Sequence, residues 1–333
     1  MVKKLLLAVA LVLGIPLIGL TIFFFWASSG RYPRDRYAEI VEFETSATAA
    51  EPNSDNEFTV VTYNIGYLSG LTNNEAVARS PEFFQANLDQ AIAALRDLNP
   101  DLIALQEIDI QARRSFNINQ VTALAEDLGL PVGAIAVNWD KNYLPFPYWP
   151  LSAHFGRLVS GQALLSRGAI ASHERLVLET VEAQPFFYQA FYISRLAQIA
   201  ELTLGGRELV VINVHLEAFD APTRRRQTEF VQELLTRYAD QPLLLVGDFN
   251  SPLPSSEFPD AEIQILLGEP RLQAAIATPE ANTFPADAPI AKLDYIFYTP
   301  EWLELVAAQV VEAAGTASDH LPVAARLRWR DGE

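Results

Sequence analysis

The sequence predicts an α/β fold in which helices cover mixed β-sheets. Apolar runs with a period of two residues alternate along the chain with runs of period 3.6, the patterns of strands and helices. One pair of strand-like runs is joined by Gly205-Gly206, which is typical of a hairpin, whereas other runs are separated by helices. The chain is 50% hydrophobic and 20% charged, a balance that supports a sizeable core and excludes a wholly disordered chain.

Three helices and a series of strands are expected after residue 58. The first helix covers residues 83–98, has one apolar face, and ends at Asn99-Pro100 because proline cannot continue a helix. The others cover 120–128 and 220–238, and Asp220 is a suitable N-cap for the last. The expected strands cover residues 58–64, 102–106, 162–166, 188–204, 207–215, 243–246, 292–298 and 323–329.

The N-terminus carries an uncharged apolar run over residues 5–27, which follows Lys3 and Lys4. At ~1.5 Å per helical residue, this run can cross a hydrocarbon layer of ~30 Å, so we expect a transmembrane anchor. A cleaved signal peptide is the alternative, with small residues at Ala27-Ser28-Ser29, although its apolar region is usually only ~7–15 residues. A buried core helix fits this length less well.

The orientation of this anchor follows from the flanking charges. Lys3 and Lys4 favour a cytoplasmic N-terminus, although basic residues also lie just beyond the other end, at 31–36. We expect a single pass with the body of the protein on the extracytoplasmic side. Residues 28–57 are rich in small and polar side chains and predict a flexible tether, which leaves one large domain over 58–330.

The composition limits the chemistry of the protein. It has no cysteine, which excludes disulfides, iron–sulfur clusters, thiolate zinc sites and a thiol nucleophile. Any metal must therefore bind oxygen ligands or one of the four histidines. The formal net charge of −17 argues against the broad basic face of a non-specific nucleic-acid binder, although a divalent cation can bridge an acidic protein to phosphate.

Polar side chains gather at or near the ends of the apolar runs. Singly, each has an ordinary explanation: Glu107 as a solvated acid, Asp248 and Asn250 as an Asx-type turn, His215 as a half-buried strand residue. Together they predict a shared cleft, because strand ends at one edge of a sheet can converge. The set comprises Asn64, Glu107, His215, Asp248, Asn250, Asp294, Asp319 and His320.

The chain resembles the endonuclease/exonuclease/phosphatase superfamily, which includes exonuclease III, pancreatic deoxyribonuclease and neutral sphingomyelinases. The resemblance covers residues 58–329 and depends on the order of several motifs, since any single tetrapeptide is a weak signal. It implies a four-layer α/β/β/α sandwich of two packed mixed sheets, with the site at one end, and hydrolysis of a phosphate ester by water. The motifs are YNIG (63–66), QE (106–107), NVHLE (213–217), GDFNS (247–251), LDYIF (293–297) and SDHLP (318–322).

The resemblance also implies a metal site built on oxygen ligands. Glu107 is expected to be the principal ligand, with Asn64 beside it. Asp319 is expected either to touch the metal or to orient a neighbouring histidine. Such ligands suit a hard cation, Mg²⁺ or Mn²⁺, which neutralises phosphate charge and steadies the leaving oxygen. One-metal and two-metal schemes both remain open.

The other five residues are expected to act in catalysis. By the resemblance, Asp248 and Asn250 orient the attacking water and contact phosphate. His320 is expected to be the general base or a transition-state partner, and Asp294 is one candidate for holding its tautomer. His215 is expected to bind phosphate or act as general acid. An unperturbed histidine pKa of ~6.5 suits either proton role at neutral pH.

The choice of substrate depends on weaker signals. NVHLE at 213–217 resembles sphingomyelinase-like and deoxyribonuclease-like branches, and residues 160–170 resemble a segment of sphingomyelinase-like relatives. The expected membrane anchor and the acidic body favour a lipid-derived or small phosphodiester over duplex DNA, and we expect a monomeric hydrolase of such an ester. A membrane-anchored or exported nuclease and a catalytically degenerate binding module are the alternatives. The aromatic residues within 139–155 predict either a substrate or membrane rim or a rigid packed loop.

Overall fold

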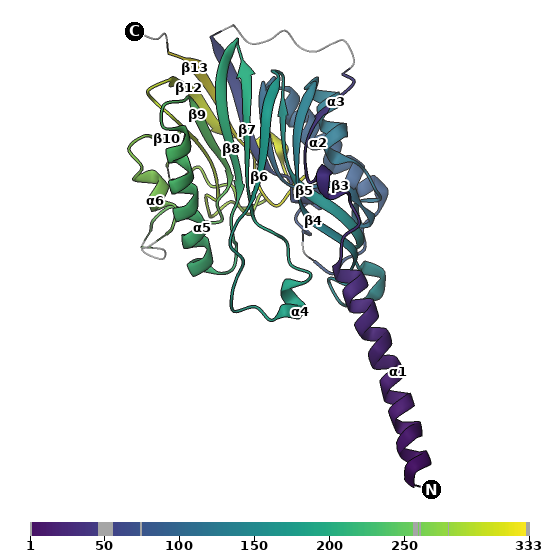
Figure 1. Ribbon diagram of the computed structural model, residues 1–333. Coiled ribbons are helices and arrows are strands. Elements are labelled where there is room, and N and C mark those ends of the chain that lie inside the picture. Colours follow the sequence, from purple (N-terminus) through teal and green to yellow (C-terminus); the bar gives the residue numbers. More distant parts are fainter. Residues whose placement is uncertain are drawn as a thin grey trace.

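The computed structural model describes residues 2–45, 56–73, 75–255, 259, 261–278 and 280–330. Within these residues, two sheets pack against each other (Figure 1). The first has seven strands in the order β1 (Ala38–Glu42), β4 (Val132–Leu144), β5 (Gly156–Ser166), β3 (Leu102–Ala112), β2 (Glu57–Asn64), β13 (Val323–Trp329), β12 (Leu303–Val310). The second has six in the order β10 (Gln273–Ala274), β11 (Asp294–Tyr298), β9 (Leu243–Asp248), β8 (Arg207–His215), β7 (Leu196–Leu204), β6 (Ile170–Val177).

Helices cover the outer face of each sheet (Figure 1). The first sheet is covered by α2 (Pro81–Arg96) and α3 (Gln120–Leu128), and the second by α5 (Ala221–Leu234) with the short α6 (Gln264–Leu267). Both sheets are mixed, because β2 pairs with β3 and β8 pairs with β9 in parallel while the other pairings are antiparallel. The predicted α/β fold of two packed mixed sheets with covering helices is confirmed.

The alternation of side chains along each strand decides what enters the gap between the sheets. In β2, Phe58 and Val60 pack in the core between the sheets, whereas Val61 and Tyr63 pack under the helices. Asn64 is an even number of residues from Phe58 and Val60, so its side chain lies on the same face, between the two sheets. The same alternation places Gln106 of β3, His215 of β8, Asp248 of β9 and Asp294 of β11 on that face.

The helices α2 and α3 agree closely with their predicted ranges, whereas several strands differ from theirs. The predicted strand over 102–106 continues as β3 to Ala112, and the one over 162–166 begins at Gly156. The first strand of the predicted hairpin begins at Leu196 instead of 188, because Pro185 leads into the short helix α4 (Phe186–Gln189). The sequence did not predict β1, β4, β6, β10 and β12, whose apolar runs are short or interrupted by polar residues.

The predicted tether requires a correction. Residues 38–42 form β1, which pairs antiparallel with β4 at the edge of the first sheet. Exposed and half-buried side chains alternate along its sequence, AEIVE, as expected of a short strand at the edge of a sheet. Residues 46–55, the most polar part of the predicted tether, lie outside the described residues.

The N-terminal run forms one helix, α1 (Val2–Ser28). The side chains of residues 5 and 7–11 lie outside the described part of the structure. A search of the described residues finds no helix that is long and apolar enough to cross a membrane. The predicted membrane span over residues 5–27 is thus not confirmed.

Candidate active site

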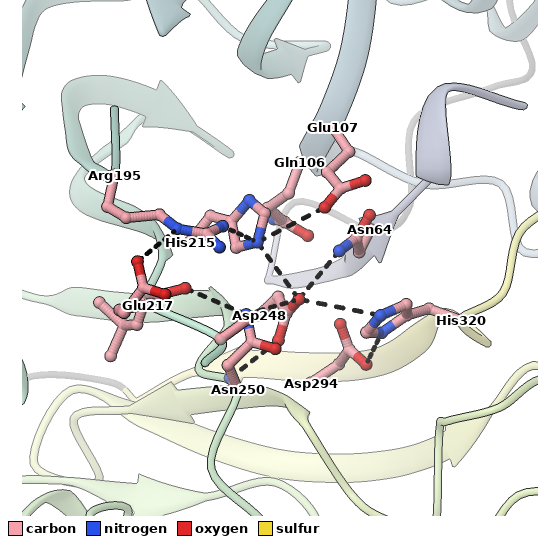
Figure 2. Close-up of polar contacts among 12 residues, drawn as sticks. Asn64, Gln106, Glu107, Arg195, His215, Glu217, Asp248, Asn250, Asp294 and His320 are labelled. Carbon is pink, nitrogen blue, oxygen red and sulfur yellow. Dashed lines mark hydrogen bonds and ion pairs between the residues drawn. The ribbon is translucent and has the colours of Figure 1, made fainter. Parts of the chain in front are cut away.

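The predicted site residues converge at one end of the two sheets, as Figure 2 shows for those that it labels. The register of the second sheet places His215, Asp248 and Asp294 directly opposite one another on three neighbouring strands. In the first sheet, Asn64 at the end of β2 lies opposite Gln106 of β3. Parallel pairing of β2 with β3 and of β8 with β9 therefore brings these strand ends to the same edge.

Asp248 lies at the centre of this group and is 1% exposed. It accepts hydrogen bonds from the Asn64 side-chain amide at 2.9 Å and from the Asn250 backbone amide at 2.9 Å. Its Oδ2 lies 3.6 Å from Nε2 of His215 and 3.9 Å from Nε2 of His320. Burial raises the pKa of Asp248 to about 7, against the opposing influence of His320, so this carboxyl can take up or release a proton near neutral pH.

The glycine of the GDFN motif allows this placement. Gly247 has a φ of +138°, and a Cβ there would lie 2.0 Å from the backbone oxygen of Val214 on the neighbouring strand. Asn250 has a φ of +50°, in the left-handed region that asparagine tolerates better than most residues. Its side-chain amide donates to the backbone oxygen of Leu216 at 3.0 Å, which fixes the loop after β9.

His320 is held by Asp294 rather than by Asp319. The Nδ1 atom of His320 lies 2.9 Å from Oδ2 of Asp294, and its Nε2 faces Asp248. Burial alone would lower the pKa of His320, but the carboxylates of Asp294 and Asp248 outweigh it and hold the pKa well above its ordinary value. His320 is therefore an imidazolium at neutral pH, which suits a hydrogen-bond donor to phosphate better than a resting general base.

Glu107 reaches the site because β3 bulges there. Before Glu107, the odd-numbered residues Ile103 and Leu105 pack under the helices, whereas after it the even-numbered residues Ile108 and Ile110 do so. The alternation of side chains therefore changes phase here, where the pairing of β3 with β5 shifts register. Glu107 itself has a φ of +50°. A regular strand would have pointed this side chain at the helical layer, so the bulge redirects it into the cleft.

The Glu107 carboxylate has three near neighbours in the described structure. The Asn73 side-chain amide donates to its Oε2 at 2.9 Å, and Nε2 of His215 lies 3.7 Å from its Oε1. Burial and the nearby carboxylate of Asp319 both raise the pKa of Glu107. Gly66 lets Asp319 come this near, since a Cβ at Gly66 would lie 2.7 Å from Oδ1 of Asp319.

A buried layer of amide side chains joins the two sheets beneath the site. The Gln106 amide donates to Oδ1 of Asn213 at 2.7 Å, across the gap between β3 and β8. Asn213 in turn donates to Oε1 of Gln198 at 3.0 Å. Because buried amides are costly unless paired, these bonds specify how the sheets sit against each other next to Glu107 and His215.

Three functional candidates were missed by sequence reasoning: Arg195, Glu217 and Tyr192. The Arg195 guanidinium is 6% exposed, lies 2.5 Å from Nε2 of His215, and is 3.5 Å from the Glu217 carboxylate. The Tyr192 hydroxyl donates to Glu217 at 2.8 Å. The predicted hairpin contained the signal for Arg195, because its two-glycine turn pairs Leu196 with His215.

Arg195 also determines the state of His215. Because the guanidinium can only donate, Nε2 of His215 accepts, and the imidazole proton lies on Nδ1. Burial, followed by the charges of Arg195 and His320, holds the pKa of His215 well below its ordinary value. His215 is thus neutral at physiological pH, which disfavours the predicted role of general acid and leaves Nε2 as an acceptor that holds the Arg195 guanidinium.

These residues line one end of a cleft of about 520 Å³, and aromatic side chains line the rest. The 139–155 segment shows both of its predicted behaviours, since Trp139, Phe146 and Tyr148 line the cleft whereas Phe155 is buried. Trp139 is fixed by a 2.8 Å hydrogen bond from its indole nitrogen to the backbone oxygen of Phe191. The further aromatic residues of the lining are Tyr67, Tyr188, Phe191, Tyr192, Phe219 and Phe284.

Comparison with known sequences assigns the family of the chain. A model of the Endonuclease/Exonuclease/phosphatase family matches residues 61–320. The chain belongs to this family. The matched range runs from β2 to His320 and contains all eight residues of the predicted site. Enzymes of this family hydrolyse phosphoric esters, so the predicted enzyme class is confirmed, whereas the substrate and the role of each residue stay predictions.

Two solved structures superpose on this chain at low sequence identity. An endonuclease/exonuclease/phosphatase from Beutenbergia cavernae DSM 12333 superposes with a TM-score of 0.64 at 21% identity, over 82% of this chain and 72% of that one. The human Nocturnin catalytic domain, solved with bound sulfate, gives a TM-score of 0.59 at 18% identity over 90% of this chain and 100% of that one. At such identities the likeness shows the fold alone.

One curated relative is more similar in sequence but over a shorter range. The UPF0294 protein of Vibrio cholerae is 34% identical over 126 residues, which is 37% of this chain and 41% of that protein. The match therefore spans less than half of the curated relative's length.

The family implies a divalent cation, and two groups of donors here fit one. Glu107 and Asp319 are acids close enough to repel each other, and both line the cleft with the Asn64 amide. The second group is Asp248, Asp294 and His320, whose ligand atoms lie within 4.8 Å of one another. In the second group, however, Asp294 is already bonded to His320, whereas the first group offers half-buried oxygen atoms to the cleft.

Proposed function

We propose that the protein is a Mg²⁺- or Mn²⁺-dependent phosphodiesterase that acts on a lipid-derived or small phosphodiester. The observation that carries this proposal is a single cleft with carboxylate, imidazole and guanidinium groups at one end and aromatic side chains over the rest. The charged end suits a phosphate group, and the aromatic wall suits an organic substituent of the ester.

The metal is proposed to bind at Glu107, Asp319 and Asn64. An ion held there would neutralise the charge of the phosphate and stabilise the leaving oxygen. Support comes from the repulsion between the Glu107 and Asp319 carboxylates, which a cation would relieve. The bulge at Glu107 and the space at Gly66 both serve to bring these two acids to the cleft.

The remaining groups are proposed to act on the water and the phosphate. Asp248 orients the attacking water and takes up its proton, as its pKa of about 7 allows, while Asn250 holds the loop that presents it. The His320 imidazolium, oriented by Asp294, donates to a phosphoryl oxygen as negative charge develops. The Arg195 guanidinium binds the phosphate from the opposite side, and neutral His215 accepts a hydrogen bond from it and orients it.

A nuclease is the second candidate function, and the aromatic wall also lends it support. Aromatic side chains can stack on the bases of single-stranded nucleic acid. The formal net charge of −17 favours a small or lipid-derived ester instead, because duplex DNA needs several basic contacts.

The N-terminal helix is proposed to anchor the protein to a membrane, with the catalytic domain on the extracytoplasmic side. Lys3 and Lys4 before the apolar run support this orientation. The catalytic domain, with β1 as the edge strand of its first sheet, is proposed to extend to residue 330 and to work as a monomer.

A substrate panel tests the proposal. Full-length protein in detergent is incubated with bis(p-nitrophenyl) phosphate, phospholipid micelles and single-stranded DNA, with Mg²⁺, Mn²⁺ or excess chelator. Metal-dependent cleavage of the first two supports the phosphodiesterase. Cleavage of DNA with no lipid activity supports the nuclease, and no metal-dependent hydrolysis of any of the three substrates would overturn the proposed function. A Glu107→Gln variant is the matched control for contaminating activity.

A further inference from the structure

Large apolar side chains that are exposed to solvent lie beside Tyr148, Tyr188 and Phe219 of the cleft lining, or belong to it. They come from three separate loops: Trp149 and Leu151 between β4 and β5, Phe186 and Phe187 at α4, and Phe219 between β8 and α5. Their exposed fractions range from 56% for Phe187 to 84% for Phe219. We call these five residues the mouth rim. Large clusters of exposed apolar side chains on a folded protein mark a surface that binds another apolar surface.

The mouth rim is joined to α1. The ring of Phe24 packs edge-on against Phe186, with centroids 5.9 Å apart, and against Phe191 of the cleft lining at 5.6 Å. The backbone amide of Asn142 in β4 donates to the oxygen of Ser29 just after the helix, at 2.7 Å. Figure 1 shows α1 leaving the sandwich from the end at which α4 lies. The helix therefore extends from the same end as the cleft mouth.

Exposed apolar side chains occur on every side of α1. Each of the following is more than 60% exposed: Val12, Leu13, Ile15, Leu17, Ile18 and Leu20. At 100° per residue, these positions leave no arc wider than about 100° around the helix. A protein partner would account for one apolar stripe, with polar residues opposite. A lipid environment accounts for apolar side chains on all sides, so lipid is the occupant that fits both α1 and the mouth rim.

We propose that the mouth rim and α1 bind one lipid surface, so that the cleft opens onto the bilayer and takes its phosphodiester from a phospholipid headgroup. This inference rests on the proposed phosphodiesterase function. Phe, Tyr and Trp side chains favour the interface between headgroups and hydrocarbon, which is the depth at which a phospholipid carries its phosphate. The strongly acidic body would be repelled by anionic lipids, so a zwitterionic surface is expected.

The contact between mouth rim and lipid is tested with a fluorescent label. The chain has no cysteine, so Leu151→Cys accepts a single environment-sensitive dye without further changes. Phe230→Cys on the exposed face of α5 is the matched control, at 43% exposure on the outer helical layer. Full-length protein is reconstituted into phosphatidylcholine vesicles that contain a lipid-bound quencher.

We expect a blue-shifted, quenched dye at position 151 and an unchanged dye at position 230. Equal emission at the two positions would overturn the docking geometry, whatever the enzyme hydrolyses.

The substrate is tested separately with Leu151→Ser/Phe187→Ser, two rim residues outside the cleft lining. Hydrolysis of vesicle phosphatidylcholine or sphingomyelin should fall by ~10-fold or more, because two apolar side chains leave the interface. Hydrolysis of soluble bis(p-nitrophenyl) phosphate should stay unchanged, and Phe230→Ser should alter neither. Equal vesicle rates in the wild type and the double variant, or no vesicle hydrolysis by an enzyme active on the soluble ester, would overturn the inference. Inactivity on the soluble ester would instead overturn the proposed function.

Discussion

Asp294 and His320 form a buried hydrogen bond of 2.9 Å at the base of the cleft, between residues 26 positions apart in the sequence. Asp294 lies on β11 and His320 just before β13, and these strands belong to different sheets. The bond therefore joins the two sheets within the site and directs Nε2 of His320 toward Asp248. It also keeps the imidazole charged, because a buried carboxylate lies beside it.

Replacing this carboxylate should slow the reaction. The Asp294→Asn variant keeps the shape of the side chain but removes the charge that orients His320 and keeps it protonated. We expect kcat for a soluble phosphodiester to fall by about 100-fold with little change in KM, since the contact acts in the transition state. Wild-type kcat in a folded variant, with the fold checked by circular dichroism, would remove Asp294 from the mechanism.

Removing the charge of Glu107 should weaken metal binding. Glu107→Gln preserves the volume and the contact with Asn73 but supplies a poorer ligand for a hard cation. Titration with Mg²⁺, followed by the shift in melting temperature, should show an apparent Kd at least about 10-fold higher. The control is Glu312→Gln, at an exposed position far along the chain. Its titration with Mg²⁺ should give the same apparent Kd as the wild type.

Replacing the guanidinium of Arg195 with an amine should weaken binding of the phosphate. Arg195→Lys retains a positive charge near Glu217 but loses the planar guanidinium that contacts His215. We expect kcat/KM to fall by about 10–100-fold, and inorganic phosphate to become a weaker competitive inhibitor. Unchanged inhibition by phosphate would show that Arg195 has a structural role alone.

His173 should make the fold less stable in acid. Burial lowers its pKa from 6.5 to about 4, and its Nε2 lies 3.1 Å from the Gln198 amide. Since the unfolded chain takes up the proton first, the stabilisation is complete above pH ~6.5 and is lost as pH falls toward 4. With a discount for partial exposure, we expect about 1–2 kcal/mol.

Urea unfolding at pH 7.5 and pH 4.5 measures this effect. The loss of stability between the two values should be smaller in His173→Gln than in the wild type, because glutamine does not titrate. An equal loss in both proteins would assign the acid sensitivity to other groups. His154→Gln is a suitable control, since this histidine lies in the exposed part of the β4–β5 connection.

Several elements and most of the site were predictable from local patterns. The helix over Gln120–Leu128 and the N-cap at Asp220 follow from apolar periodicity and capping. The alternation that buries Val246 and Leu244 also carries Asp248 into the gap between the sheets. Where a polar residue ends a regular strand, the face of the sheet to which its side chain points follows from the alternation of side chains along the strand.

The sequence by itself determined the family, the positions along the chain of the strands that carry the site, and the eight polar residues that meet at one end of the two sheets. Tertiary structure alone decided that Glu107 turns inward through a bulge, that Asp294 and not Asp319 holds His320, and that Arg195 lies against His215. It also decided that aromatic residues from β4 and from five connecting segments surround one cleft. Local propensity acts between near neighbours in the chain, whereas these features arise only when two sheets pack and bring distant residues into contact.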